Sequence, residues 1–129
     1  MTKRLAIIAG KGRMPLDVAH AAADDGYMPL VMPINGQADA DFTAFETAPI
    51  RLGAIGTTRS LLRDRGIDQL VLAGKVEWPS FRDLRPDRDG VKLLGKMVTR
   101  GDDEVLRLLK DYFAAQGIAI IGVDHFMPS

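Results

Sequence analysis

Cysteine is absent from this sequence, which excludes disulfides and thiol chemistry and is compatible with a reducing cytoplasm. A net charge is absent too, because 17 basic residues balance 17 acidic ones. The whole molecule therefore has no field that would hold nucleic acid or an anionic membrane, and any anion site must be local. We expect no nucleic-acid partner.

Long apolar runs are also missing. After residues 1–4, only six apolar or small residues come before Lys11, which is too few for a signal sequence or a membrane span. We therefore expect a soluble, cytoplasmic domain. Attachment to the inner membrane surface through some other segment stays open as an alternative.

What the chain does contain is the composition of one folded domain. Its 129 residues are 47% hydrophobic and 26% charged, which is ordinary for a globular protein with one core. Short apolar runs predict strands at residues 5–9, 27–34, 50–52, 68–74 and 118–123. Apolar residues at helical spacing predict helices at 15–26, 55–65, 90–99 and 102–116.

This alternation predicts a three-layer α/β domain with about five mostly parallel strands and flanking helices. The second strand is expected to be short or marginal, because Pro29 and Pro33 cannot donate to a sheet ladder. Residues 37–48 are polar and acidic, and they predict a loop or a short helical turn.

The first candidate site is the turn between the first strand and the first helix. Gly10 and Gly12 leave the backbone bare, and Pro15 suits the first turn of a helix. A helix N-terminus attracts anions, and Lys11 and Arg13 add two cations, so the turn predicts contact with a phosphate or nucleotide. A glycine turn required only for tight packing is the alternative.

The second candidate region is the connection 75–89, which is long for a compact domain and leaves the carboxyl end of a predicted central strand. A solvated, salt-bridged loop is the alternative. Asp102 and Asp103 precede a helix and are interpreted as caps. The residues predicted to contact a ligand are Lys75, Arg82, Asp83, Arg85 and Asp87, together with Asp124 and His125 after the last strand.

Several common ligand classes of α/β sheets do not fit the sequence. A dinucleotide site needs a third glycine where Pro15 stands, and an acidic residue where the second strand ends in Asn35 and Gly36. The first turn holds no hydroxyl residue for a phosphate-binding P-loop. His and carboxylate residues show no short metal-ligand spacing, so no metal site is predicted in this chain.

Residues spread along almost the whole chain form an ordered pattern: Ile7, Ile8, Ala9, Gly10, Gly12, Met14, Pro15, Leu16, Gly53, Gly56, Leu72, Ala73, Gly74, Pro79, Leu84, Asp87, Gly101, Asp102, Asp103, Gly122 and His125. The pattern resembles one family, the LpxI-type UDP-2,3-diacylglucosamine pyrophosphatases. No single motif carries the likeness. The chain departs from it at Trp78, where many relatives have an arginine.

The resemblance implies that residues 1–129 are a single Rossmann-like amino-terminal domain, with the family's carboxyl-terminal catalytic domain absent from this chain. It also implies a magnesium-dependent hydrolase of lipid A biosynthesis that splits UDP-2,3-diacylglucosamine into UMP and lipid X. The family's acidic catalytic residues are attributed to the other domain. Catalytic residues are therefore unassigned here, and the isolated chain is expected not to be competent.

Two functional hypotheses follow. In the first, the chain is the substrate-binding domain of such a pyrophosphatase, and its partners are the nucleotide-sugar lipid and the carboxyl-terminal domain. Peripheral contact with a membrane and homo-oligomer formation are compatible with it. In the second, the chain is a non-catalytic nucleotide-binding or assembly module.

Overall fold

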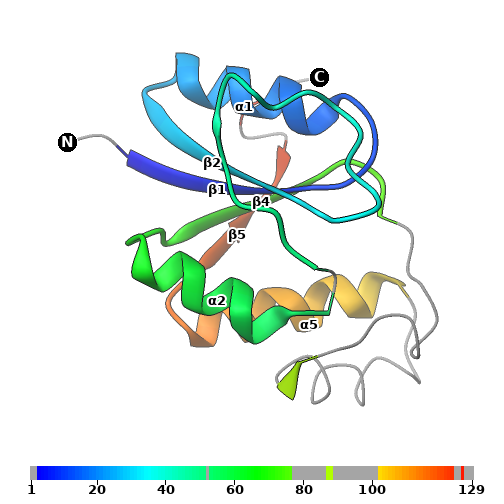
Figure 1. Cartoon of the computed structure of the whole chain (residues 1–129). Coiled ribbons are helices and arrows are strands. Elements are labelled where there is room, and N and C mark those ends of the chain that lie inside the picture. The colour runs from blue at the N-terminus through cyan, green and yellow to red at the C-terminus, as the bar shows by residue number, and fades with distance from the viewer. Residues whose placement is uncertain (1–2, 52, 77–86, 89–101, 124–125, 127–129) are drawn as a thin grey trace.

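A computed structural model describes residues 3–51, 53–76, 87–88, 102–123 and 126. Its centre is a five-stranded sheet in the order β3-β2-β1-β4-β5, with every neighbouring pair parallel. The strands are β1 (Lys3–Ala9), β2 (Tyr27–Pro33), β3 (Glu46–Thr47), β4 (Gln69–Ala73) and β5 (Ala119–Ile121). Helix α1 (Met14–Asp24) covers one face, and helices α2 (Ile55–Asp64) and α5 (Asp102–Ala115) cover the other (Figure 1). The predicted three-layer α/β fold is confirmed.

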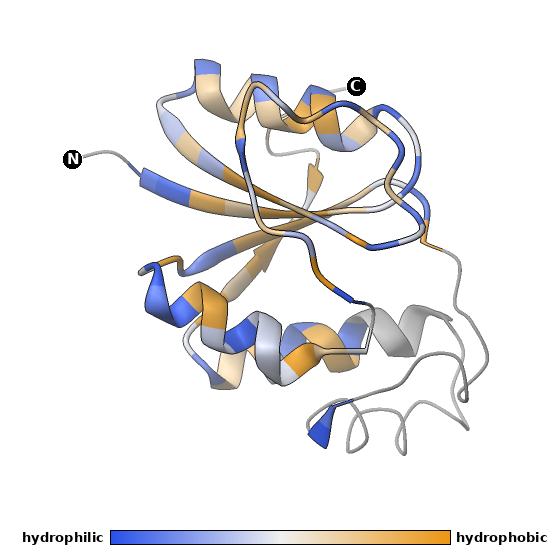
Figure 2. Ribbon diagram, viewed as in Figure 1, coloured by the Kyte–Doolittle hydropathy of each residue, from blue (hydrophilic) through white to orange (hydrophobic). Residues whose placement is uncertain are grey.

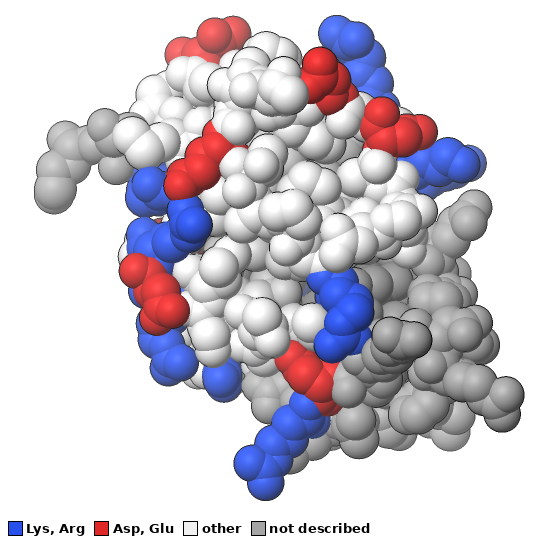
Figure 3. All heavy atoms as spheres, in the orientation of Figure 1, with Lys and Arg blue, Asp and Glu red and all other residues white. Residues whose placement is uncertain are grey.

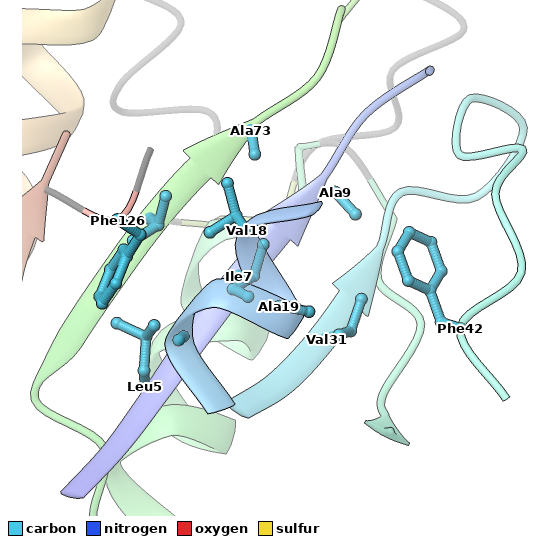
Figure 4. Close-up of a cluster of buried hydrophobic side chains, with 11 residues drawn as sticks. Leu5, Ile7, Ala9, Val18, Ala19, Val31, Phe42, Ala73 and Phe126 are labelled. Carbon is cyan, nitrogen blue, oxygen red and sulfur yellow. The ribbon is translucent and has the colours of Figure 1, made fainter. Parts of the chain in front are cut away.

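Strand β1 is buried on both faces, as its unbroken apolar run predicts. Leu5 and Ile7 belong to a cluster that includes Val18 of α1 (Figure 4). Ala6 belongs to a second cluster, with Leu62 of α2 and Phe113 of α5 on the other side of the sheet. Figure 2 shows the same division, because apolar residues concentrate along the central strands and on the helix faces turned toward them. The core therefore consists of two apolar layers separated by the sheet.

Strand β2 lies within the predicted bounds 27–34, but it is a regular strand and not the short or marginal one that its prolines suggested. It pairs with β1 along seven residues, from Lys3 with Tyr27 to Ala9 with Pro33. The reason is the direction in which the prolines face. Pro33 accepts a hydrogen bond from the Ile50 N–H on the β3 side, so its missing N–H also faces β3. Pro29 lies four residues earlier, and because backbone groups alternate in direction along a strand, its backbone faces the same side as that of Pro33. The β1–β2 ladder therefore loses no donor to either proline.

The third strand was predicted at residues 50–52, but the structure places it at Glu46–Thr47. Farther along, Ile50 forms only an isolated bridge with Ile34. Segment 46–50 runs alongside β2 and pairs with it at two separate places, first at residues 46–47 and then at Ile50. Apolar content pointed to the second of these places, whereas the pairing that defines β3 involves two exposed polar residues.

Helices α1, α2 and α5 begin and end within about two residues of the predicted bounds. The predicted helix at 90–99 and most of the connection 75–89 lie outside the described residues. In the part of the chain that the structure describes, no helix has the length and apolar character needed to cross a bilayer.

Candidate functional site

The strand order indicates where a ligand is expected, namely at the carboxyl ends of the strands, between β1 and β4. The chain passes from β1 through α1 to β2 on one side, whereas β4 pairs with β1 on the other side. In open α/β sheets, ligands bind at the carboxyl ends of the strands where the order reverses in this way. Here the segments that leave this point are residues 10–13, called the glycine turn, and residues 74–75 (Figure 1).

Backbone hydrogen bonds hold these two segments together. The Gly10 N–H donates to the Ala73 carbonyl at 2.8 Å. Lys11 and Lys75 then exchange both bonds of an antiparallel bridge, at 2.7 and 2.9 Å. The main chain therefore closes the space between the carboxyl ends of β1 and β4. A ligand that binds here must lie outside the Lys11–Lys75 bridge, on its solvent side.

The glycines of this region serve different purposes. A Cβ at Gly10 would lie 2.3 Å from the Lys75 carbonyl oxygen, so the close approach of the two segments requires glycine there. Gly74 has φ +90°, and its Cβ would meet Lys11 O at 2.9 Å and Pro15 Cγ at 3.0 Å. Gly12 is different: it is exposed, has φ +100°, and a Cβ there would meet no atom within 4 Å. Tight packing explains Gly10 and Gly74, while Gly12 faces open space.

The cations of the site are arranged as a pair and a separate arginine. Lys11 and Lys75 lie opposite each other in the antiparallel bridge, and both are exposed. Opposed residues of such a bridge project to the same side, where like charges repel. Arg13 is engaged elsewhere, because its Nε lies 3.1 Å from Oδ1 of Asp17 one turn along α1. The lysine pair is therefore the local positive charge that an anion would neutralise.

A carboxylate already contacts the glycine turn. Oδ1 of Asp39, in the connection between β2 and β3, accepts the Gly12 N–H at 2.9 Å. Asp39 was not among the residues predicted from the sequence, since it lies 27 positions away in a segment interpreted only as a polar loop. The one available signal was topological, because loops that follow neighbouring parallel strands meet at one edge.

Asp87 lies at the N-terminus of another helix. Its Oδ2 accepts the Thr57 N–H of α2 at 3.1 Å, and its own N–H donates to the Gly53 carbonyl at 3.2 Å. Residue Ala54, which precedes α2, supplies no side-chain cap. Asp87 therefore caps α2 from a distant part of the chain. The other predicted residues of this group, Arg82, Asp83, Arg85, Asp124 and His125, lie outside the described residues.

A hollow of about 310 Å³ lies at the carboxyl end of β2, lined by the segment 48–51 and by helix α2. Its polar lining includes Asn35, Arg51 and Thr57, and its apolar lining includes Ile50 and Leu61. This volume is at the lower end of the range for small-ligand sites. None of its lining residues was predicted from the sequence to bind a ligand.

Two exposed carboxylates away from the glycine turn, Asp41 and Glu46, are engaged in local contacts. The Thr43 N–H lowers the pKa of Asp41, and hydrogen bonds from Arg4 and Arg65 lower the pKa of Glu46. On the face shown in Figure 3, acidic and basic side chains are interspersed along the described part of the rim, and the middle of the face is uncharged. Within the described residues, no three histidine, aspartate or glutamate side chains are grouped closely enough to hold a metal ion. The described residues therefore do not fit a magnesium site.

The fold is shared with proteins of solved structure. The chain is similar to the enzyme WbmH of Bordetella bronchiseptica, whose structure is a complex with NAD+, at TM-score 0.56 and 10% identity over 95% of this chain and 55% of that one. It is also similar to a UDP-N-acetylglucosamine 4-epimerase of Bacillus cereus, at TM-score 0.52 and 17% identity over 94% of this chain and 39% of that one. At these identities, the likeness shows a Rossmann-type fold alone.

The sequence comparisons are more specific. The chain is 32% identical over 128 residues to the UDP-2,3-diacylglucosamine pyrophosphatase LpxI of Caulobacter vibrioides. The match covers 97% of this chain and 46% of the relative, so the chain spans less than half of that protein's length. A family model described as the LpxI N-terminal domain matches residues 4–129. The chain therefore belongs to the LpxI N-terminal domain family.

Proposed function

We propose that this chain is the substrate-binding domain of a UDP-2,3-diacylglucosamine pyrophosphatase that acts in the cytoplasm. The observation that carries the proposal is the family match over residues 4–129, joined to a relative that bears this activity in its name. The reaction is hydrolysis of the substrate's diphosphate to UMP and the acylated sugar phosphate.

In this proposal the glycine turn and the lysine pair hold the diphosphate. Gly12 is exposed, and its N–H already donates to a carboxylate, which shows that an oxyanion can reach it. Lys11 and Lys75 lie opposite each other without an ion pair to any described carboxylate. An anion between two like charges relieves their repulsion, so a diphosphate suits this position. The hollow beside Asn35 offers the adjoining part of the ligand a mixed polar and apolar surface.

The remaining predicted residues complete the proposed binding set. Gly10 and Arg13 belong to the same turn, and Asp87 contributes by holding the start of α2 in place. We propose that Arg82, Asp83, Arg85, Asp124 and His125 approach the ligand from the connection after β4 and from the segment after β5. Substitution of any one of these last five residues to alanine in the complete protein should raise KM for the lipid substrate.

Catalysis is proposed to need a second domain. Magnesium, which the family resemblance implies, supplies Lewis-acid chemistry to phosphoryl transfer when bound. The family resemblance assigns its carboxylate ligands to the family's carboxyl-terminal domain, and the described residues of this chain group no three side chains that could hold a metal ion. This chain's own residues would bind and orient the nucleotide end of the substrate.

Hydrolysis measured in two preparations tests the proposal. One is the 129-residue chain alone, and the other is the same chain fused to the carboxyl-terminal half of the Caulobacter relative. We expect release of UMP from UDP-2,3-diacylglucosamine only in the fusion. Turnover by the 129 residues alone would overturn the division of labour between the domains.

Ligand titration separates this function from the non-catalytic alternative. The fluorescence of the single tryptophan, Trp78, is followed during addition of UMP, NADH or FMN. A response to UMP supports the pyrophosphatase assignment. A response only to NADH or FMN contradicts it, and silence toward all three together with an inactive fusion favours an assembly module.

A further inference from the structure

The carboxylate of Asp39 occupies a position at the glycine turn where a ligand oxyanion would bind. Its Oδ1 lies 2.9 Å from the Gly12 nitrogen, a normal distance for a charge-assisted hydrogen bond. Both residues are exposed, and the position of a Cβ on Gly12 is open apart from the two neighbouring residues of the chain. A ligand oxyanion can therefore take the place of the carboxylate at the Gly12 N–H once the carboxylate moves away.

The backbone around Asp39 is held in place on both sides. On the amino side, the Ile34 carbonyl accepts the N–H groups of Gln37 and Ala38 at 3.0 and 3.1 Å. On the carboxyl side, Phe42 is 6% exposed and packs in the core cluster on the α1 face (Figure 4). Between these anchors, Asp39 itself is exposed. Its carboxylate can therefore leave the Gly12 N–H by side-chain rotation, without unfolding of the loop.

The charges around the turn give this contact a consequence for ligand selection. Lys11 and Lys75 attract an anion to the edge of the sheet, whereas the Asp39 carboxylate repels the same anion at short range and already uses a donor N–H. A small anion that contacts the turn alone has to displace Asp39 for a single hydrogen bond. A larger ligand that also contacts the lysine pair gains enough additional interactions to do so.

We propose that Asp39 is a specificity-determining residue, an internal competitor that lowers the affinity of the glycine turn for free phosphate. The inference rests on the proposed function only in taking the glycine turn as the phosphate-binding position. It assigns Asp39 no contact with the reacting atoms. Its role is to keep the Gly12 N–H occupied until a ligand with several contacts arrives.

Titration of inorganic phosphate and of pyrophosphate into the full 129-residue chain tests this inference, with the Gly12 amide followed by nuclear magnetic resonance. Asp39→Asn keeps an oxygen acceptor and removes the charge, and Asp39→Ala removes both. We expect phosphate to bind both variants about fivefold more tightly than the unmodified chain, because one nearby like charge at a surface is worth about 1 kcal/mol. The gain should shrink as salt is added.

Asp41→Asn is the matched control. Asp41 is an exposed carboxylate of the same loop, but it accepts the N–H of Thr43 at 3.0 Å within its own segment. Phosphate affinity should be the same in this variant as in the unmodified chain. An equal gain in the Asp41 variant would show a general charge effect and overturn the inference.

The phosphate affinities of the two Asp39 variants decide whether Asp39 competes with the ligand. Unchanged or weaker phosphate binding in both Asp39 variants, or no phosphate-induced shift of the Gly12 amide in any chain, overturns the inference even where the fused protein hydrolyses the lipid substrate. Tighter binding in both Asp39 variants supports it even where the fusion is inactive. The two proposals therefore fail independently.

Discussion

At the scale of single residues, one amino-acid type meets three different demands at the edge of the sheet. Gly10 is required by close approach of main chain, Gly12 by a positive φ in open space, and Gly74 by both. An alanine at Gly10 collides with a backbone carbonyl that is tied into a bridge, so neither partner can move freely. An alanine at Gly12 meets only the cost of a left-handed conformation.

Gly10→Ala should therefore be the more damaging of two matched substitutions. We expect it to lower the free energy of unfolding by about 2 kcal/mol or more through overpacking. Gly12→Ala should lower it by about 1 kcal/mol. Urea denaturation of the two variants and the unmodified chain measures both changes. Equal losses would mean that the main-chain bridge is not the constraint at Gly10.

At the scale of elements, helix α2 and the turn before α1 share one device. The residues that precede the two helices, Arg13 and Ala54, provide no side-chain cap. Instead, a carboxylate from a distant segment accepts an N–H at each place, Asp39 at the turn and Asp87 at α2. These contacts join loops to helices, so capping here also fixes the positions of the connections around the sheet edge.

Removal of the cap of α2 should cost stability. Asp87→Ala leaves the Thr57 N–H to water and removes a negative charge from the positive end of the helix dipole. We expect a loss of about 1 kcal/mol in the free energy of unfolding. Arg88→Ala, at the exposed neighbouring position, is the control and should change stability by less than about 0.5 kcal/mol. A larger effect at Arg88 would contradict the capping role of Asp87.

The edge strand β3 pairs with β2 through its backbone and is also tied to the rest of the fold by ion pairs. Glu46 accepts hydrogen bonds from Arg4 of β1, at 3.0 Å, and from Arg65 after α2. These bonds place the pKa of Glu46 below its ordinary value of 4.5. A depressed pKa adds stability above the ordinary value, and that stability is lost as pH falls through the pKa of the folded state.

Glu46→Gln should therefore reduce stability at neutral pH and have little effect in acid. The side chain is 46% exposed, so the loss at pH 7 should be below about 1 kcal/mol. Denaturation curves measured between pH 7 and pH 3 should show the difference between the two proteins closing as Glu46 is protonated. A difference independent of pH would indicate lost packing instead of a lost ion pair.

At the scale of the whole molecule, Phe126, after β5, packs beside the beginning of β2. Phe126 is 8% exposed, and its ring meets that of Tyr27 edge-on with centroids 5.3 Å apart. It belongs to the core cluster on the α1 face, with Leu5 of β1 (Figure 4). Residues 99 positions apart in the sequence, Tyr27 and Phe126, thus close the fold on this face.

Phe126→Ala should destabilise the whole domain. Loss of a buried aromatic ring and the cavity left behind should lower the free energy of unfolding by about 3 kcal/mol. Met28→Ala, next to Tyr27 but 46% exposed, should change it by less than about 0.5 kcal/mol. Thermal unfolding followed by circular dichroism compares the variants. A small effect at Phe126 would show that the segment after β5 does not complete the core.

The order of strands and helices, the buried character of β1 and the glycine turn could be predicted from local pattern alone. Each depends on residues close together in the chain, where apolar spacing and the stereochemistry of glycine act directly. Apolar content misplaced the third strand, whose paired residues are polar. The prolines suggested a marginal β2, because local pattern does not show toward which neighbouring strand a backbone donor points. The site residues Arg82, Asp83, Arg85, Asp124 and His125 stay predictions.

By itself, the sequence determined that this protein forms a parallel α/β sheet with a glycine turn at its first helix and belongs with the LpxI N-terminal domains. Only the tertiary structure decided that Lys11 lies opposite Lys75, that Asp39 bonds to Gly12 and that Asp87 caps α2. Helices and strands are encoded by residues a few positions apart, so the sequence pattern reveals them. These three contacts join residues far apart in the chain, and they depend on the strand order and on the course of the loops. The charge that a ligand would meet at the sheet edge is therefore a property of the folded molecule.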